Sequence, residues 1–345
     1  MRRRVLRVWI GVGLAGLAAL GAGAGFGAGL GVGVGAMSRA VEPPPAVPAP
    51  VVEQHAAIAP AAALAPVVPP VLADVARPVP VTAPMAVPQA AVEVRPAWQR
   101  NAVSPVPANG RPRIAVVIDD VGVHVPNAQR TVDLPGPLTL SLMTYATNLP
   151  KLAEAAHAHG HELMLHVPME PEDGADPVDP GPNVLDTGLP AAELHRRMQW
   201  ALDRADGLGI VGINNHMGSK FTADRGAMTS LMQELSARGL LFLDSLTTGH
   251  SVGRVTARAA NVPFVARDVF LDNEETPEAV RQQLKAVEAA AKRDGTAVAI
   301  GHPKAVTLDA LRAWLPTLAA RGFVLVPLTD LVPDEAPAVV AKAAR

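Results

Sequence analysis

The chain has 345 residues with a net charge of −2, and its 29 glycines and 34 prolines argue against one uniform globular domain. Residues 1–112 carry nine Arg and four acidic residues, whereas residues 113–345 carry 21 basic and 28 acidic residues, and this acidic body argues against a nucleic-acid partner. Because there is no cysteine, a disulfide framework, a thiolate metal site and a cysteine nucleophile are excluded, so any metal must be held by His and carboxylates.

The first 39 residues predict a membrane anchor. Four arginines within the first seven residues precede an uncharged apolar run, Val8–Met37, which is long enough to cross a hydrocarbon core of about 30 Å and too long for a signal-peptide core. The basic N-terminal side and the lack of a small-residue cleavage site before Arg39 predict a single uncleaved span. We therefore expect residues 1–39 to hold an exported body to the membrane.

Residues 40–111 predict a linker. They consist largely of Ala, Val and Pro, with 16 prolines between residues 40 and 110. Such a segment cannot bury a core, so we expect a disordered tether, although a Pro-rich segment can also bind a partner's groove. The body then covers 112–333, and 334–345 form a C-terminal tail.

The body alternates short apolar runs with helical segments, which predicts either a (β/α) barrel or a doubly wound sheet. The expected strands are Ile114–Ile118, Leu138–Leu142, Leu163–Leu165, Ile210–Ile213, Leu240–Leu243, Ala297–Ile300 and Phe323–Val326. The expected helices are Pro150–His159, Pro190–Asp206, Asp224–Arg238, Pro277–Asp294 and Thr307–Arg321.

Polar residues follow five of these strands, at the face where (β/α) barrels build their active sites. They are Asp119, Asp120, His166, Glu170, Asn214, Asn215, His216, Asp244, Ser245 and His302. One carboxylate and two imidazoles would hold a divalent ion with coordination positions left open, as in hydrolytic zinc sites. Asp119, Asp120, His166 and His216 could supply that set, with one aspartate binding the ion and the other accepting a proton or orienting an imidazole.

Six motifs carry a family resemblance: IAVVIDDVG, GHELMLHVPMEP, GINNHMGSKFT, LFLDS, RDVFLDN and AIGHP. In this order over residues 113–332 they resemble the NodB-like polysaccharide deacetylase superfamily, and within it the divergent polysaccharide deacetylases of bacterial envelopes, the YibQ-like group. The resemblance implies a distorted (β/α) barrel with a divalent metal, usually zinc, which removes N-acetyl groups from a sugar polymer. With the anchor, it implies a bacterial inner-membrane protein whose body lies in the periplasm.

By this resemblance, Asp119 is the general base, Asp120 a metal ligand and His166 the first histidine of the second motif. His302 corresponds to a late histidine that acts as general acid toward the leaving amine. A histidine titrates in the range that this role requires.

The chain departs from the family pattern at two places. Glu170 replaces a second histidine, and Asn214, Asn215 and His216 replace an arginine of the third motif. Either His216 or Glu170 could complete the ligand set, or the metal could be weak or absent. We favour His216, because it restores one Asp and two His, which leaves Glu170 as a substrate-contacting, ligand-orienting or loop carboxylate.

The remaining candidates lie near the later strand ends. Asp244 and Ser245 could orient a ligand or touch the sugar, and Arg267 could form an ion pair with Asp268 that orients a catalytic group. Together with Asn214 and Asn215 they make up the expected substrate-binding or supporting residues.

The sequence thus predicts a metal-dependent hydrolase that removes N-acetyl groups from an envelope glycan. The alternative is a membrane-tethered protein without catalytic activity that binds a glycan or protein through a degenerate barrel. A hydrolase for another substrate, such as a phosphoester, is disfavoured by the acidic body and by the lack of a Gly-rich phosphate loop.

Overall fold

The computed structural model describes residues 95–172, 174 and 178–333. The expected anchor, most of the expected linker and the C-terminal tail lie outside the described residues. Within these ranges, no helix combines the length and apolarity needed to cross a membrane.

The described strands form one parallel sheet in the order β6-β5-β4-β3-β2-β1-β8-β7, with β9 beside β1. All residues of β2 and β3 are buried, as expected for parallel strands that are covered on both faces. The strands are β1 Arg113–Val121, β2 Thr139–Met143, β3 Glu162–Met169, β4 Gly212–Met217, β5 Leu241–Asp244, β6 Phe264–Ala266, β7 Val269–Phe270, β8 Thr296–Gly301 and β9 Val324–Leu325.

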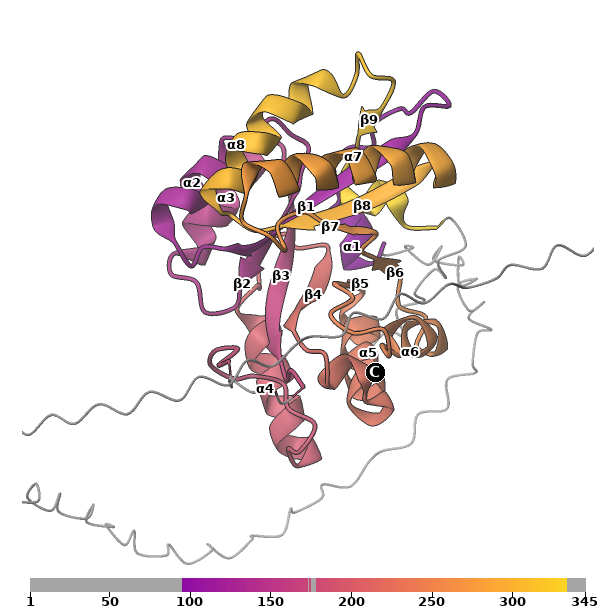
Figure 1. Ribbon diagram of the computed structural model, residues 1–345. Coiled ribbons are helices and arrows are strands. Elements are labelled where there is room, and N and C mark those ends of the chain that lie inside the picture. The colour runs from indigo at the N-terminus through magenta and orange to yellow at the C-terminus, as the bar shows by residue number, and fades with distance from the viewer. Residues whose placement is uncertain (1–94, 173, 175–177, 334–345) are drawn as a thin grey trace, which may run out of the picture. The chain divides into compact units, whose positions relative to one another are not determined.

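Helices connect the strands and cover the sheet (Figure 1), with α7 packed on β1 and β8. The local sequence sets their ends: α7 begins after Thr276, whose hydroxyl caps the helix, and ends at Gly295 in the left-handed conformation. The helices are α1 Ala97–Arg100, α2 Val125–Val132, α3 Leu149–Ala158, α4 Ala191–Asp203, α5 Arg225–Arg238, α6 Gly253–Ala259, α7 Pro277–Asp294 and α8 Ala305–Trp314, with 3₁₀ turns η1 Phe221–Ala223, η2 Leu315–Thr317 and η3 Leu328–Leu331.

The sheet is curled rather than a regular closed barrel (Figure 1). In the described part of the chain, no ladder joins its two ends, β6 and β7. These strands are consecutive in sequence, and residues Arg267 and Asp268 link them. The Arg267 amide donates to Asp244 O at 3.0 Å, and the Asp268 amide donates to Val298 O at 2.9 Å. The chain therefore crosses from one end of the curled sheet to the other in two residues.

Residues 95–111, which the composition assigns to the linker, pack against the body. The amide of Trp98 in α1 donates to Gly239 O at 2.9 Å, Asn101 Nδ2 donates to Ile210 O at 2.7 Å, and the Val106 amide donates to an Asp330 carboxylate oxygen at 2.9 Å. Apolar contacts of Trp98 and Val106 add to these bonds. The composition did not predict this packing, because residues 95–111 contain few large apolar side chains and resemble the Pro- and Ala-rich linker before them.

Candidate metal centre

Asp120, His166 and His216 converge at the carboxyl ends of β1, β3 and β4. Their candidate ligand atoms all lie within 4.8 Å of one another. Asp120 Oδ1 is 3.4 Å from His166 Nε2 and 3.0 Å from His216 Nδ1, and the two imidazole nitrogens are 3.2 Å apart. Three atoms able to donate lone pairs thus face one small space.

The donor set fits a divalent cation. Asp120 Oδ1 is buried, and despite the short distances neither imidazole offers it a well-directed hydrogen bond. A buried carboxylate oxygen without a donor is costly, and a cation beside it would remove that cost. One carboxylate and two imidazoles are also the ligands that zinc takes in hydrolytic sites.

Electrostatics at the cluster favour positive charge. Burial alone would lower the pKa of His166, but the carboxylates of Asp119 and Asp120 outweigh burial and raise that pKa to about 9. Burial likewise opposes ionisation of Asp120, yet His166 and His216 hold the pKa of its carboxyl well below the usual range. The cluster therefore attracts a proton or a metal cation.

The backbone turns both aspartates toward the cluster. Neighbouring residues of a regular strand point to opposite faces, but Asp120 adopts the left-handed conformation with φ of 54°, which Asp tolerates better than most residues. The register of β1 against β2 also shifts between Ile118 and Val121. As a result Asp119 Oδ2 lies 3.6 Å from His166 Nε2, on the same side as Asp120.

Asn214 connects the cluster residues from within the core. Its Oδ1 accepts hydrogen bonds from His166 Nδ1 at 2.9 Å and from Ser141 Oγ. Its Nδ2 donates to Asp119 Oδ1 at 2.9 Å and to Ser245 Oγ at 3.1 Å. Because a carboxylate only accepts, this network assigns the amide orientation, so neutral His166, the form that binds a metal, carries its proton on Nδ1 and directs the Nε2 lone pair at the cluster.

Asp119 has the environment of a base. Its carboxyl is buried but lines the cleft described below, and burial raises its pKa against the opposing charges of His166 and His302 and the Asn214 hydrogen bond. A raised pKa makes the carboxylate a stronger proton acceptor.

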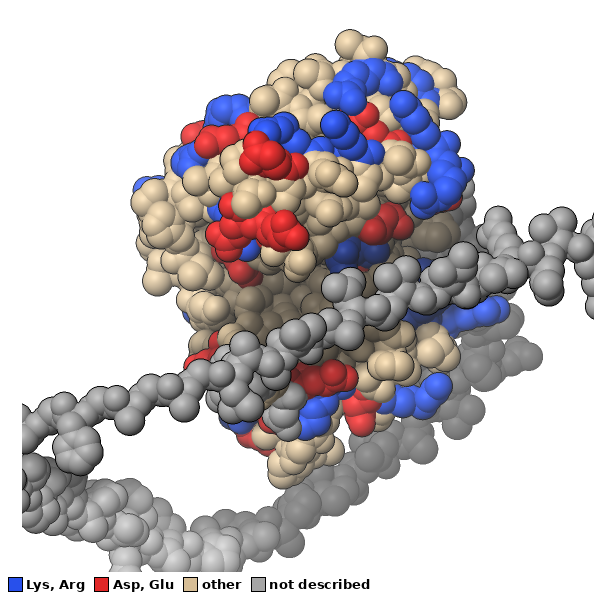
Figure 2. Space-filling view, in the orientation of Figure 1, with Lys and Arg blue, Asp and Glu red and all other residues tan. Residues whose placement is uncertain are grey.

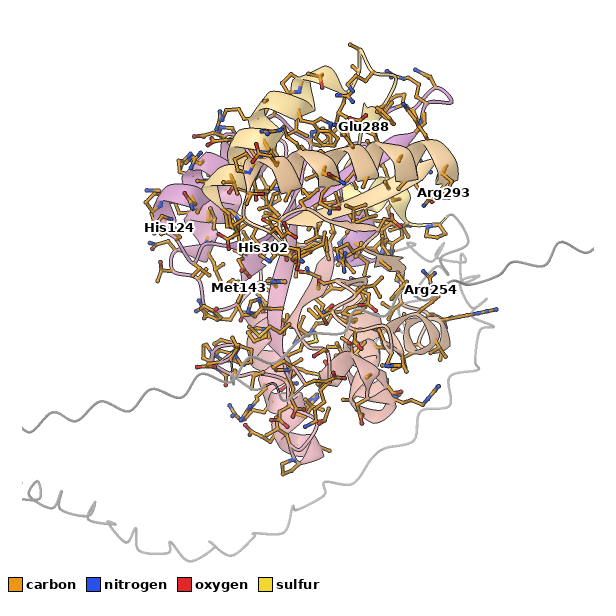
Figure 3. The ribbon with its side chains drawn as sticks, in the orientation of Figure 1. His124, Met143, Arg254, Glu288, Arg293 and His302 are labelled. Carbon is orange, nitrogen blue, oxygen red and sulfur yellow. The ribbon has the colours of Figure 1, made fainter. Side chains whose placement is uncertain are left out.

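His302, the residue directly after β8, faces the cluster and is held by Asp272, a residue that the sequence analysis did not single out. His302 Nδ1 donates to Asp272 Oδ1 at 2.9 Å, and the His302 amide donates to Oδ2 at 2.7 Å. His302 Nε2 lies 3.9 Å from Asp120 Oδ2. In Figure 3 His302 is labelled near the middle of the view of the domain, whereas His124 is labelled at its edge. The only signal for Asp272 was its place in RDVFLDN.

Glu170 does not join the cluster. Its carboxylate accepts hydrogen bonds from the amide and hydroxyl of Thr187, at 2.8 and 2.6 Å, and from Lys220 Nζ at 2.6 Å. These contacts tie the segment after β3 to the turn after β4. Of the two ligand alternatives, His216 therefore has the required geometry and Glu170 does not.

Two of the other predicted site residues brace loops instead of facing the cluster. Asp244 accepts hydrogen bonds from the Leu246 amide and Ser251 Oγ, at 2.9 and 2.6 Å, and so shapes the turn after β5. Asn215 Oδ1 accepts from the Ser245 amide at 2.9 Å and holds that turn to β4.

The prediction that Arg267 forms an ion pair with Asp268 is wrong. No such pair forms among the described residues, because Asp268 Oδ2 accepts from the Val298 amide at 2.8 Å while Arg267 donates to backbone carbonyls. The Asp268 carboxylate acts on Arg267 only through its field.

The cluster opens into a cleft of about 900 Å³. In Figure 2 the surface is hollowed below α7, and both acidic and basic side chains border the hollow. Residues lining the cleft include Asp119, Asp120, His166, Asn215, His216, Ser245, Arg267, Asp268, Phe270, Gln283, His302 and Lys304. The candidate metal centre is thus accessible to a ligand the size of a sugar residue.

Comparison with known proteins places the chain in a family. The model of the family "Divergent polysaccharide deacetylase" matches residues 116–332. The chain is 34% identical to an uncharacterised Haemophilus influenzae protein over 206 residues, 60% of this chain and 72% of that protein. It is 33% identical to the uncharacterised Escherichia coli protein YibQ over 200 residues, 58% of this chain and 61% of YibQ.

A solved structure shares the fold. The crystal structure of the uncharacterised Agrobacterium tumefaciens protein ATU2773 matches with a TM-score of 0.65 and 28% identity, over 69% of this chain and 95% of that chain. Sequence and fold thus agree, and this chain belongs to the divergent polysaccharide deacetylase family.

Proposed function

We propose that the protein is a metal-dependent hydrolase that removes N-acetyl groups from a glycan of the cell envelope. The observation that carries the proposal is the convergence of Asp120, His166 and His216 around a buried carboxylate oxygen without a hydrogen-bond donor. A base and an acid, Asp119 and His302, line the same cleft. Family membership supports an acetylated sugar as the substrate.

The chemistry is hydrolysis of an amide. A divalent cation, most simply zinc, would polarise the acetamide carbonyl and make water more acidic. Asp119 removes a proton from the attacking water, and its hydrogen bond from Asn214 fixes the direction of its carboxylate. The water oxygen bonds to the carbonyl carbon, the C–N bond breaks, and His302 protonates the departing amine, so the products are acetate and an amino sugar.

Asp272 supports the acid. Its hydrogen bond to His302 Nδ1 leaves Nε2 facing the cleft, where the leaving nitrogen would lie. Burial alone would lower the pKa of His302, but Asp272 together with Asp119 and Asp120 raises it, so the imidazole holds a proton more readily at neutral pH.

Metal content of the purified chain tests the proposal directly. We expect about one zinc or similar ion per chain after zinc is supplied, and loss of that ion in the Asp120→Ala/His216→Ala double variant. Glu170→Gln is the matched control. The Glu170 carboxylate lies nearby but holds two loop segments together through Thr187 and Lys220, so this variant should keep the ion.

Acetate release from acetylated glycans by the metal-loaded chain is the second measurement, with Asp119→Asn as the inactive comparison. If the chain binds no stoichiometric metal, the hydrolase is wrong, and a glycan-binding or protein-binding module becomes the better account. Equal metal content in the double variant would overturn the ligand assignment.

A further inference from the structure

Arg267 is a fixed cation in the cleft. It lies at the link between β6 and β7, and its side chain donates from Nε to Ser245 O at 2.7 Å and from Nη2 to Leu246 O at 2.9 Å. Its guanidinium carbon lies 5.1 Å from the centre of the Phe270 ring. Two hydrogen bonds and an aromatic face therefore hold one orientation of the guanidinium.

This cation has no acidic partner. Within 4.0 Å of the guanidinium the described residues place no carboxylate, and the neighbouring Asp268 is engaged with the Val298 amide. The other cation lining the cleft, Lys304, differs because it forms an ion pair with Glu275 at 2.8 Å. More distant carboxylates, Asp119 and Asp244 among them, act on Arg267 only through their field.

The arrangement is that of a recognition residue. Carbonyl acceptors use two of the five N–H groups, and the remaining N–H groups have no protein partner and are not sealed from solvent. A rigid guanidinium loses little conformational entropy when it binds an anion, and its planar fork matches a carboxylate. A purely structural arginine would be expected to direct those groups at protein acceptors.

Phe270 links Arg267 to the reacting groups. Its ring centre is 5.3 Å from that of His302 in an edge-to-face arrangement and 5.1 Å from the guanidinium carbon, so that carbon lies at most about 10 Å from the ring centre of the candidate acid. A span up to that length covers one or two sugar residues. An anion on Arg267 and an acetamide at His302 would therefore belong to the same sugar residue or to direct neighbours.

We propose that the substrate is an anionic glycan, in which a carboxylate close to the N-acetyl group binds Arg267. This inference rests on the proposed function for the position of the acetamide. It narrows the substrate class from acetylated glycans in general to those that carry a carboxylate near the acetylated nitrogen.

Calorimetric titration with two matched tetrasaccharides tests the proposal. One is neutral chitotetraose, and the other carries a 3-O-lactyl carboxylate on alternate N-acetylated residues. We expect the wild-type chain to bind the anionic tetrasaccharide at least about tenfold more tightly, as a charge-assisted hydrogen bond allows. Arg267→Gln should lose this preference, so that the ratio of its affinities for the two tetrasaccharides falls to about one.

Two further variants control for folding and for charge. Arg254→Gln removes another arginine that packs on an aromatic ring, 4.8 Å from Phe264, but from α6 outside the cleft (Figure 3), and should keep the preference. Arg267→Lys keeps the positive charge but lacks the planar pair of N–H donors. It should therefore retain only part of the preference for the anionic tetrasaccharide. Thermal unfolding of each variant shows whether the domain stays folded.

The outcomes separate the two proposals. Equal affinity of the wild-type chain for the two tetrasaccharides, no binding of either, or a preference that Arg267→Gln retains would overturn the anion site. A preference that depends on Arg267 in a chain that releases no acetate would support the anion site and count against the hydrolase. Turnover of neutral and anionic glycans at equal kcat/KM would support the hydrolase proposal and overturn the anion site.

Discussion

Asn214 determines which nitrogen of His166 faces the candidate metal. Its Oδ1 accepts the Nδ1 proton of His166, and its Nδ2 can donate to the Asp119 carboxylate only in this orientation. One fully buried amide therefore couples a candidate ligand to the candidate base. Hydrogen-bond partners of this kind commonly change metal affinity by 10–100-fold when they are removed.

We predict that Asn214→Ala lowers zinc affinity by about 10–100-fold. Without the acceptor, His166 can place its proton on Nε2, where it blocks the lone pair. Competition with a zinc chelator measures the affinity, and nitrogen-15 NMR of the histidines in the metal-free chain reports the tautomer at a pH above the His166 pKa of about 9, where the ring is neutral. Ser245→Ala, which removes only a neutral partner of the same amide, should change neither. An unchanged tautomer in Asn214→Ala would contradict the assignment.

The sequence identified residues at the site but could not identify their contacts. Asp120, His166 and His216 were recognisable because each comes shortly after a short apolar run that predicts a strand. Asp272 was not, because β7 is only two residues long and its partner His302 is distant in sequence. The loop-bracing role of Glu170 was equally hidden, since its partners Thr187 and Lys220 are brought to it only by the fold.

Glu162, at the start of β3, gives the sheet a pH-dependent link to η3. Its buried carboxyl accepts hydrogen bonds from Thr139 Oγ1 at 3.1 Å and from the Thr329 amide at 3.3 Å. Burial outweighs these bonds and raises the pKa of Glu162 to about 7, from an ordinary value of 4.5. The folded protein therefore keeps this proton over a range in which the unfolded chain releases it.

We predict that this group lowers the free energy of unfolding as the pH rises from 4.5 to about 7, by about 3 kcal/mol in total, with no further loss above that range. Glu162→Gln stays neutral, so it should remove this component and be more stable than the wild type at pH 8. Urea unfolding across the range measures the difference. Exposed Glu154→Gln in α3 is the control, and parallel curves for Glu162→Gln and wild type would refute the prediction.

At the scale of elements, short apolar runs of Val, Ile and Leu predicted the strands that build the middle of the sheet. Capping residues fixed α5 and α7 within one residue, because Asp224, Pro277 and the glycines after each helix act locally. The edge strands β6 and β7 were missed, since strands of three and two residues carry no periodic signal. The crossing at Arg267 depends on these short strands, so the sequence did not predict it, whereas the curl of the sheet was implied by the family resemblance as a distorted barrel.

At the scale of the whole described chain, the carboxyl ends and the amino ends of the strands have separate roles. The candidate metal centre lies at the carboxyl ends of the strands. Residues 95–111 bind near the amino ends, where their hydrogen bonds reach Ile210 and Gly239, just before β4 and β5, and Asp330 in η3. The segment therefore stabilises the fold without contributing to the candidate site.

We predict that a chain beginning at residue 112 unfolds at a Tm about 5–10 °C below that of a chain beginning at residue 95, because it loses three long-range hydrogen bonds and the packing of Trp98 and Val106. Metal content should be equal in both, since the segment contacts no cluster residue. Calorimetry measures the Tm values and elemental analysis measures the metal content, with the full chain as reference. Equal Tm values would show that this segment contributes nothing to stability. Loss of metal on truncation would show that the segment at the amino ends of the strands affects metal binding at their carboxyl ends.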